Sequence, residues 1–246
     1  MASAAGSALT LEQLVAQLVA AYGESVRTIA LYGSAAAGEH VPHRSDINVL
    51  VLVDALPLEV LRRVAPTSRA WSAGGNPPPL TMTVAEWRRS SDVFPMEYAD
   101  ILERHRVLHG ALPTDGIAVT PRDLRLQVEQ EAIGKLLRLR GHVMAIGDDR
   151  EKQSALLAQS LSTIMAIFRG VVRLHNDRAD LEYDDLARHL STLTSGAVPA
   201  APFERVVAHR RGTAPIPPDG LADALAQYLD GMERLVRYLD AYPTAT

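Results

Sequence analysis

The sequence predicts an α/β domain followed by an all-helical bundle, and three observations lead to this fold class. Short β-branched runs alternate with helical patterns over the first 115 residues. One of these runs, INVLVLV, has the apolar character of a central strand that is covered on both faces. After residue 120 only helical stripes recur. We therefore expect domains at residues 1–115 and 120–246.

The elements of the first domain follow from local periodicity. Apolar residues at helical spacing predict a first helix, and they are Leu11, Leu14, Val15, Leu18 and Val19. SVRTIALYG then predicts a strand that ends on glycine, and INVLVLV a second strand. PLEVLRRVAPTSRAW predicts a helix, and GGNPPP a loop before the short strand LTMTV. MEYADILERH predicts a further helix and RVLHG a last strand, so this domain combines a short sheet with helices.

The second domain begins with a strong helix-start signal. Thr120 is suited to cap a helix that has Pro121 at its first position and Asp123 at its third. One apolar stripe then continues along a long amphipathic helix, through Leu124, Val128, Ala132, Leu136, Leu139 and Val143. Similar stripes in SALLAQSLSTIMAIFRGVVRLH and LADALAQYLDGMERLVRYLDAY complete the pattern of a helical bundle.

Composition limits the possible functions. The 246 residues are 47% hydrophobic and include no cysteine, which excludes disulfides, thiolate metal sites and cysteine nucleophiles. A net charge of −4 does not provide a cationic platform for long nucleic acid. No apolar run approaches the roughly 20 residues that span a bilayer, so we expect a cytoplasmic protein without membrane contact. A small ligand is the better expectation.

The stretch LYGSAAAGEHVPHRSDINVLVLV carries the chemistry. Gly33 ends a strand and allows close backbone approach, and Ser34 can cap a short helix whose N–H groups would face a phosphate. Ser45 lies at the mouth of the following strand. Asp46 and Asn48 are two residues apart on that strand, so both point to the same side.

This arrangement of Gly-Ser and a spaced D-h-D or D-h-E motif resembles the polymerase-β-type nucleotidyltransferases, especially their minimal and aminoglycoside-modifying bacterial branches. The resemblance implies a nucleotidyltransferase-like first domain. It also implies Mg²⁺ bound on strand carboxylates and transfer of a nucleotidyl group from ATP, or another nucleoside triphosphate, to a hydroxyl. It assigns Gly33 and Ser34 to the phosphates and Asp46 to metal. SSDVFPMEYADILERHRVLHG and DLRLQVEQEAIGKLLRLR resemble bacterial proteins that pair this domain with a C-terminal helical one.

Asn48 occupies the position of the second carboxylate, and LTMTV offers no third one. We expect Asp46 and Asn48 to form the catalytic and metal site, with catalysis weakened because Asn48 is neutral. Glu97 is a candidate compensating carboxylate, beside Asp92 and Asp100. Lys135 on the long helix is a candidate triphosphate ligand. The acceptor is a small hydroxylated molecule or a protein. The alternatives are a degenerate nucleotide-binding or regulatory protein, and an interaction module of toxin–antitoxin type.

Overall fold

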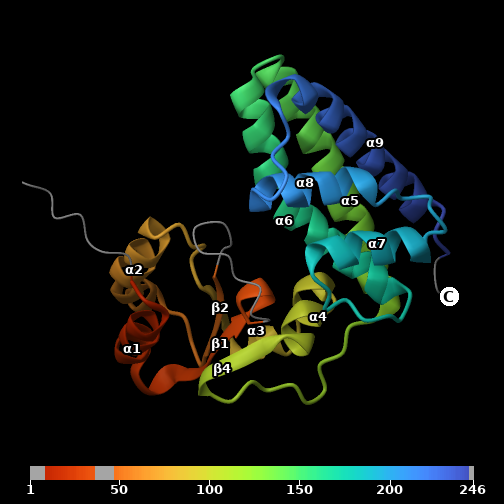
Figure 1. Cartoon of the computed structure of the whole chain (residues 1–246). Helices are drawn as coiled ribbons and strands as arrows, with labels where there is room; N and C mark the ends of the chain where they lie inside the picture. The colour runs from red at the N-terminus through yellow and green to blue at the C-terminus, as the bar shows by residue number, and fades with distance from the viewer. Residues whose placement is uncertain (1–8, 37–46, 244–246) are drawn as a thin grey trace, which may run out of the picture. The chain divides into compact units, whose positions relative to one another are not determined.

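The computed structural model describes residues 9–36 and 47–243 (Figure 1). The chain divides into two compact units, Met1–Val119 and Thr120–Thr246. The first contains a small mixed sheet with helices and is called the α/β unit here, and the second is called the helical unit. The fold class predicted from the sequence is therefore confirmed.

Four strands form the sheet of the α/β unit in the order β3-β2-β1-β4. The two central strands are β1 (Val26–Tyr32) and β2 (Asn48–Val53), and the edges are β3 (Leu80–Thr83) and β4 (His105–Gly110). β1 is antiparallel to β2 and β4, whereas β2 and β3 are parallel. The continuous apolar sequence of β2 fits this central place, since five of its six residues are buried.

Helices cover both faces of this sheet (Figure 1). On one face α1 (Leu11–Tyr22) and α2 (Leu58–Ala73) enclose a core with alternate residues of β1 and β2. On the other face the shorter helices α3 (Val84–Trp87) and α4 (Pro95–Glu103) form a second core with the remaining β2 residues. The helix α3 has no counterpart among the elements predicted from the sequence.

Two of these helices begin with a capping box that the sequence encodes. Thr10 accepts a hydrogen bond from the backbone N–H of Gln13, whose side chain accepts one from the backbone of Thr10. Thr83 and Glu86 make the same reciprocal pair before α3. Each pair satisfies two donors that a helix start otherwise leaves without partners, which fixes where the helix begins.

The second core contains an aromatic stack that ties α3 to α4. The rings of Trp87 and Tyr98 are stacked with centroids 4.2 Å apart, and both side chains are buried. The Tyr98 hydroxyl donates to the Trp87 carbonyl at 2.7 Å, and the Trp87 indole N–H donates to the Pro113 carbonyl at 2.8 Å. The stack therefore holds α4 in a defined place beside the sheet.

The helical unit is a bundle whose centre is α6. Its helices are α5 (Pro121–Ile146), α6 (Arg150–Leu174), α7 (Tyr183–Leu193), α8 (Ala201–Arg211) and α9 (Leu221–Asp240), and the short 3₁₀ turn η3 (Pro218–Gly220) precedes α9. A similar 3₁₀ turn in the α/β unit, η1 (Gly23–Ser25), follows α1. α6 packs against the other four helices. Thr120 caps α5 as predicted, and the predicted stripe is buried except for Val143, which is half-buried.

The apolar character of α6 corrects one expectation from the sequence. An 18-residue window of this helix has a mean hydropathy of 1.6, so by length and composition alone it could cross a membrane. In the structure 61% of that window is buried inside the unit. The central helix of a bundle is more apolar than a surface helix because it packs against several neighbours.

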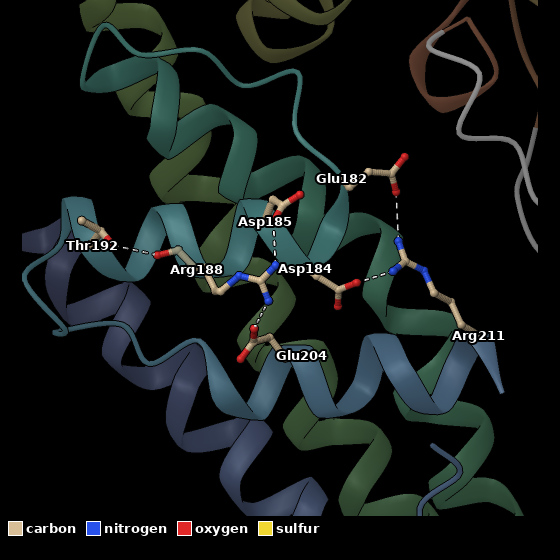
Figure 2. Close-up of polar contacts among 7 residues, drawn as sticks. All are labelled: Glu182, Asp184, Asp185, Arg188, Thr192, Glu204 and Arg211. Carbon is tan, nitrogen blue, oxygen red and sulfur yellow. Dashed lines mark hydrogen bonds and ion pairs between the residues drawn. The ribbon is translucent and has the colours of Figure 1, made fainter. Parts of the chain in front are cut away.

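Ion pairs connect α7 and the segment before it to α8 (Figure 2). Arg188 of α7 bonds Asp185 on its own helix and Glu204 on α8, both at 2.6 Å. Arg211 of α8 bonds Glu182 at 2.9 Å and also pairs with Asp184. All these side chains are at least partly exposed, so the pairs orient the two helices more than they stabilise them.

Candidate functional site

Gly33 marks the point where β1 ends and a tight turn begins. It is the first residue of the 3₁₀ turn η2 (Gly33–Ala35), and its φ of +73° is in the left-handed region that favours glycine. A Cβ atom at this residue would lie 3.2 Å from the side-chain nitrogen of Asn48 and 3.7 Å from a carboxylate oxygen of Asp100. The absence of a side chain therefore lets two polar groups approach the end of β1.

Asn48 is the first residue of β2 and pairs with Tyr32 across the antiparallel ladder. Alternation along the strand places Asn48 on the same face as Leu50 and Leu52, which pack in the core under α3 and α4. Its side chain is half-buried. The neutral amide therefore faces the α4 side of the sheet, beside Gly33.

Asp100 approaches the same point from α4. Its other carboxylate oxygen accepts a hydrogen bond from the guanidinium of Arg104 at 2.7 Å, one turn further along. The Arg104 and Asp100 side chains are 7% and 22% exposed. A charged pair this well shielded from water keeps much of its attraction, so the arginine holds the carboxylate in place. The position of Asp100 depends on how α4 packs, which no local sequence signal specifies.

A pocket with a volume of about 580 Å³ lies on this face of the α/β unit, next to Tyr32. Burial raises the pKa of the Tyr32 hydroxyl to about 12, and the negative charges of Glu97 and Asp100 add to this effect. Glu97, the compensating carboxylate considered from the sequence, lines the pocket. The residues that line it are Tyr32, Leu80, Thr81, Met82, Glu86, Ser90, Phe94, Glu97, Tyr98 and Ile101.

Of the site residues expected from the sequence, the structure brings Gly33 and Asn48 together. Ser45 and Asp46 lie outside the described residues, and the side chain of Ser34 is not among those described. Lys135 belongs to α5 of the helical unit and is half-buried. Burial lowers the pKa of its ammonium group, and the nearby Arg138 lowers it further. The assignment of Lys135 to the triphosphate stays a prediction.

The possible metal ligands of the described residues do not form a cluster. Within residues 9–36 and 47–243, no three Asp, Glu or His side chains lie close enough together to hold a metal ion. The edge strand β3 carries no carboxylate in its sequence LTMT. The described residues alone therefore do not fit a preformed two-metal site.

Comparison with known proteins identifies the fold. No protein-family model and no curated protein sequence matches the chain. A solved structure does match: the crystal structure of spectinomycin adenyltransferase AAD(9) from Enterococcus faecialis with ATP and spectinomycin. The likeness has a TM-score of 0.52 at 13% sequence identity and covers 89% of this chain and 96% of the other. At this identity the match shows a nucleotidyltransferase-like fold that extends over both units.

Proposed function

We propose that this protein binds a nucleoside triphosphate at the end of β1 and transfers a nucleotidyl group to a hydroxyl acceptor, with catalysis weakened by Asn48. The observation that carries the proposal is the glycine turn at Gly33, with Asn48 beside it on the neighbouring strand. The fold agrees with it, because the similar adenyltransferase structure contains ATP. The 13% identity means that the activity itself is our inference.

The turn after β1 provides the phosphate contact in this proposal. The first N–H groups of a helical turn have no partners within the turn, and they stabilise an anion without a basic side chain. Gly33 begins such a turn, and a residue with a side chain there would meet Asn48. We assign the backbone of Gly33 and Ser34 to the triphosphate. We also assign Ser45 to the triphosphate in this proposal.

The weak point of the site is its negative charge. We assign Mg²⁺ to the Asp46 carboxylate and the Asn48 amide oxygen, since magnesium prefers oxygen ligands. Replacing a carboxylate by an amide removes an attraction of up to about 4 kcal/mol for a unit charge pair at about 4 Å and an effective dielectric constant of about 20. A metal that arrives bound to the nucleotide can still be held, but a second metal is disfavoured.

One observation favours a second candidate function, a degenerate nucleotide-binding or regulatory protein. Asn48 is neutral and β3 offers no carboxylate, so two of the three anionic positions expected of an active transferase are not filled from these strands. Two carboxylates on α4 favour the active transferase over this alternative, because they supply negative charge near the site: Glu97 lines the pocket and Asp100 lies beside Gly33. The pocket beside Tyr32 is large enough for part of a small hydroxylated acceptor.

Titration calorimetry with ATP, in Mg²⁺ and in EDTA, tests the binding step. We expect wild-type protein to bind ATP in Mg²⁺ and Asp46→Ala to lose the Mg²⁺-dependent part. Asp54→Ala is the matched control, because Asp54 is an exposed carboxylate paired with Arg27. Gly33→Val is a poorer test, since a β-branched residue at positive φ strains the backbone whatever the ligand does.

The transfer step requires labelled ATP and a panel of hydroxylated small molecules and proteins. We expect slow wild-type transfer that Asn48→Asp accelerates. Binding of ATP without transfer to any acceptor, in both forms, would favour the degenerate alternative. Failure of the wild-type protein to bind ATP in Mg²⁺ would refute both.

A further inference from the structure

The helix α5 has a second apolar stripe that points to solvent. Leu126, Ile133, Leu137 and Met144 are 51%, 38%, 57% and 80% exposed. They are separate from the buried stripe that packs in the bundle. Within the described part of the helical unit, all the large exposed hydrophobic side chains lie on this one helix. Scattered exposed leucines are ordinary, whereas four apolar side chains on one line of one helix have the pattern of an interaction surface.

The stripe has the spacing of a coiled-coil seam. When the two polar residues on the same line, Gln130 and Arg140, are counted with the four apolar ones, successive positions are four, three, four, three and four residues apart. This spacing is the heptad pattern. All six side chains of this α5 seam are exposed. In order they are Leu126, Gln130, Ile133, Leu137, Arg140 and Met144.

The α5 seam is also symmetric about its own centre at residue 135. Leu126 and Met144 are each nine residues from that position, and Ile133 and Leu137 are each two residues from it. The polar positions are equally symmetric. A surface that is complementary to its own reverse is what a two-fold symmetric contact between identical subunits requires.

We propose that α5 packs antiparallel against α5 of a second copy of this chain, about a two-fold axis at residue 135. With a rise of about 1.5 Å per residue, Leu126 then lies at the height of the partner's Met144. Ile133 lies at the height of the partner's Leu137. Every exposed apolar side chain of the α5 seam gains an apolar neighbour.

Charge selects the antiparallel arrangement. Glu129 lies beside the α5 seam, on the same side of the helix as the seam residue Arg140. The antiparallel register brings Glu129 within about 1.5 Å in height of the partner's Arg140. The two-fold axis repeats this ion pair. A parallel pairing in register would instead place Arg140 in the seam against its own copy, which repels. Charge complementarity therefore supports a second copy in one orientation.

The ion pairs inside each chain allow this contact. Arg140 bonds Glu233 at 2.8 Å, with side chains 47% and 41% exposed. Glu129 pairs with Arg125 at 3.0 Å. A guanidinium has five N–H donors and a carboxylate accepts several hydrogen bonds, so each group can hold its internal partner and a partner across the interface.

Sedimentation equilibrium of the full chain measures the association. We expect a reversible dimer, and Leu137→Glu should weaken it about 100-fold or more, because both copies lose an apolar contact and gain a buried charge. Leu61→Glu on α2 is the control, since Leu61 is 44% exposed but lies outside the α5 seam. A wild-type chain that stays monomeric at about 100 µM, where even weak dimers form, overturns the proposal.

Reversing charges tests the flank. Glu129→Arg should weaken the dimer by placing it against the partner's Arg140, and adding Arg140→Glu should restore association. The single and the double variant both lose the ion pair between Glu129 and Arg125 within each chain. Recovery of dimerisation in the double variant therefore reports the contact between the two copies. Equal weakening in both variants would contradict the proposed flank contact.

Cysteine cross-linking tests the register, because the chain has no native cysteine. A mixture of Leu126→Cys and Met144→Cys proteins should form a covalent dimer when treated with a thiol oxidant. Leu126→Cys alone should not, since its copies would be about 27 Å apart and a disulfide needs Cα atoms within about 7 Å. Efficient cross-linking of Leu126→Cys alone would overturn the antiparallel register.

Discussion

Asn48→Asp should destabilise the α/β unit when metal is removed and recover stability when Mg²⁺ is added. The Asn48 side-chain nitrogen and the Asp100 carboxylate lie 3.2 and 3.7 Å from one point at Gly33. They are therefore no more than about 7 Å apart, where two like charges repel by about 2 kcal/mol at an effective dielectric constant of about 20. Arg104 neutralises part of the Asp100 charge, so the net penalty is about 1–2 kcal/mol.

Thermal unfolding in EDTA and in Mg²⁺ measures this penalty. A loss of about 1–2 kcal/mol lowers the Tm of a domain of this size by about 4–10 °C. Mg²⁺ should remove most of that loss in the variant, because a cation between the carboxylates replaces repulsion by attraction. Wild type should respond less. Asn176→Asp in the helical unit is the control, since Asn176 is exposed and its change should not depend on Mg²⁺.

Two results would refute this reasoning. If Asn48→Asp has the same Tm as wild type in EDTA, the amide and the Asp100 carboxylate do not share one electrostatic site. If the variant is destabilised but Mg²⁺ does not restore it, the site does not hold the metal.

Three further predictions follow from the α/β unit. Gly110→Ala should destabilise the protein by more than about 3 kcal/mol in urea unfolding, because its Cβ would lie 1.9 Å from a backbone oxygen of β1. Gly75→Ala is the control: Gly75 also has a positive φ, but no atom lies near its added Cβ, so the change should cost about 1–2 kcal/mol. Asp100→Ala should lower the free energy of unfolding by about 2–4 kcal/mol, because the buried Arg104 loses this carboxylate partner. Asp54→Ala removes an exposed carboxylate and should cost about 1 kcal/mol or less. Equal losses in the two variants would contradict the role of burial. Burial of protonated Tyr32 contributes stability that is fully present below the unfolded pKa near 10 and is lost as pH rises toward the folded pKa of about 12. Tyr32→Phe lacks this titrating group, so it should lose less stability than wild type between pH 8 and 11. Urea unfolding at the two pH values measures the difference.

The sequence predicts the elements well where one local pattern decides them. The β-branched run of β2 and the Thr120-Pro121 start of α5 are examples, because burial on both faces and helix capping leave local signatures. The strand order is different: β2 is antiparallel to β1 and parallel to β3, and periodicity does not encode which strands become neighbours. The short α3 was missed because a single turn is too brief for a periodic pattern.

The candidate site shows the same division. Gly33 and Asn48 were predicted from spacing along the chain and lie together in the structure. Asp100 joins them through the packing of α4 on the sheet, which depends on contacts far apart in sequence. Its spacing to Arg104 does predict an ion pair on one helix face, but it does not indicate where that face points.

The buried tryptophans give the two units separate optical signals. Trp71 and Trp87 are the two tryptophans of the chain, both in the α/β unit and each at most 1% exposed. Tryptophan emission therefore records the unfolding of the α/β unit, whereas far-ultraviolet circular dichroism is dominated by the long helices of the other. Comparing the two melting curves measures how strongly the units are coupled, and a nucleotide bound at β1 should move the fluorescence transition first.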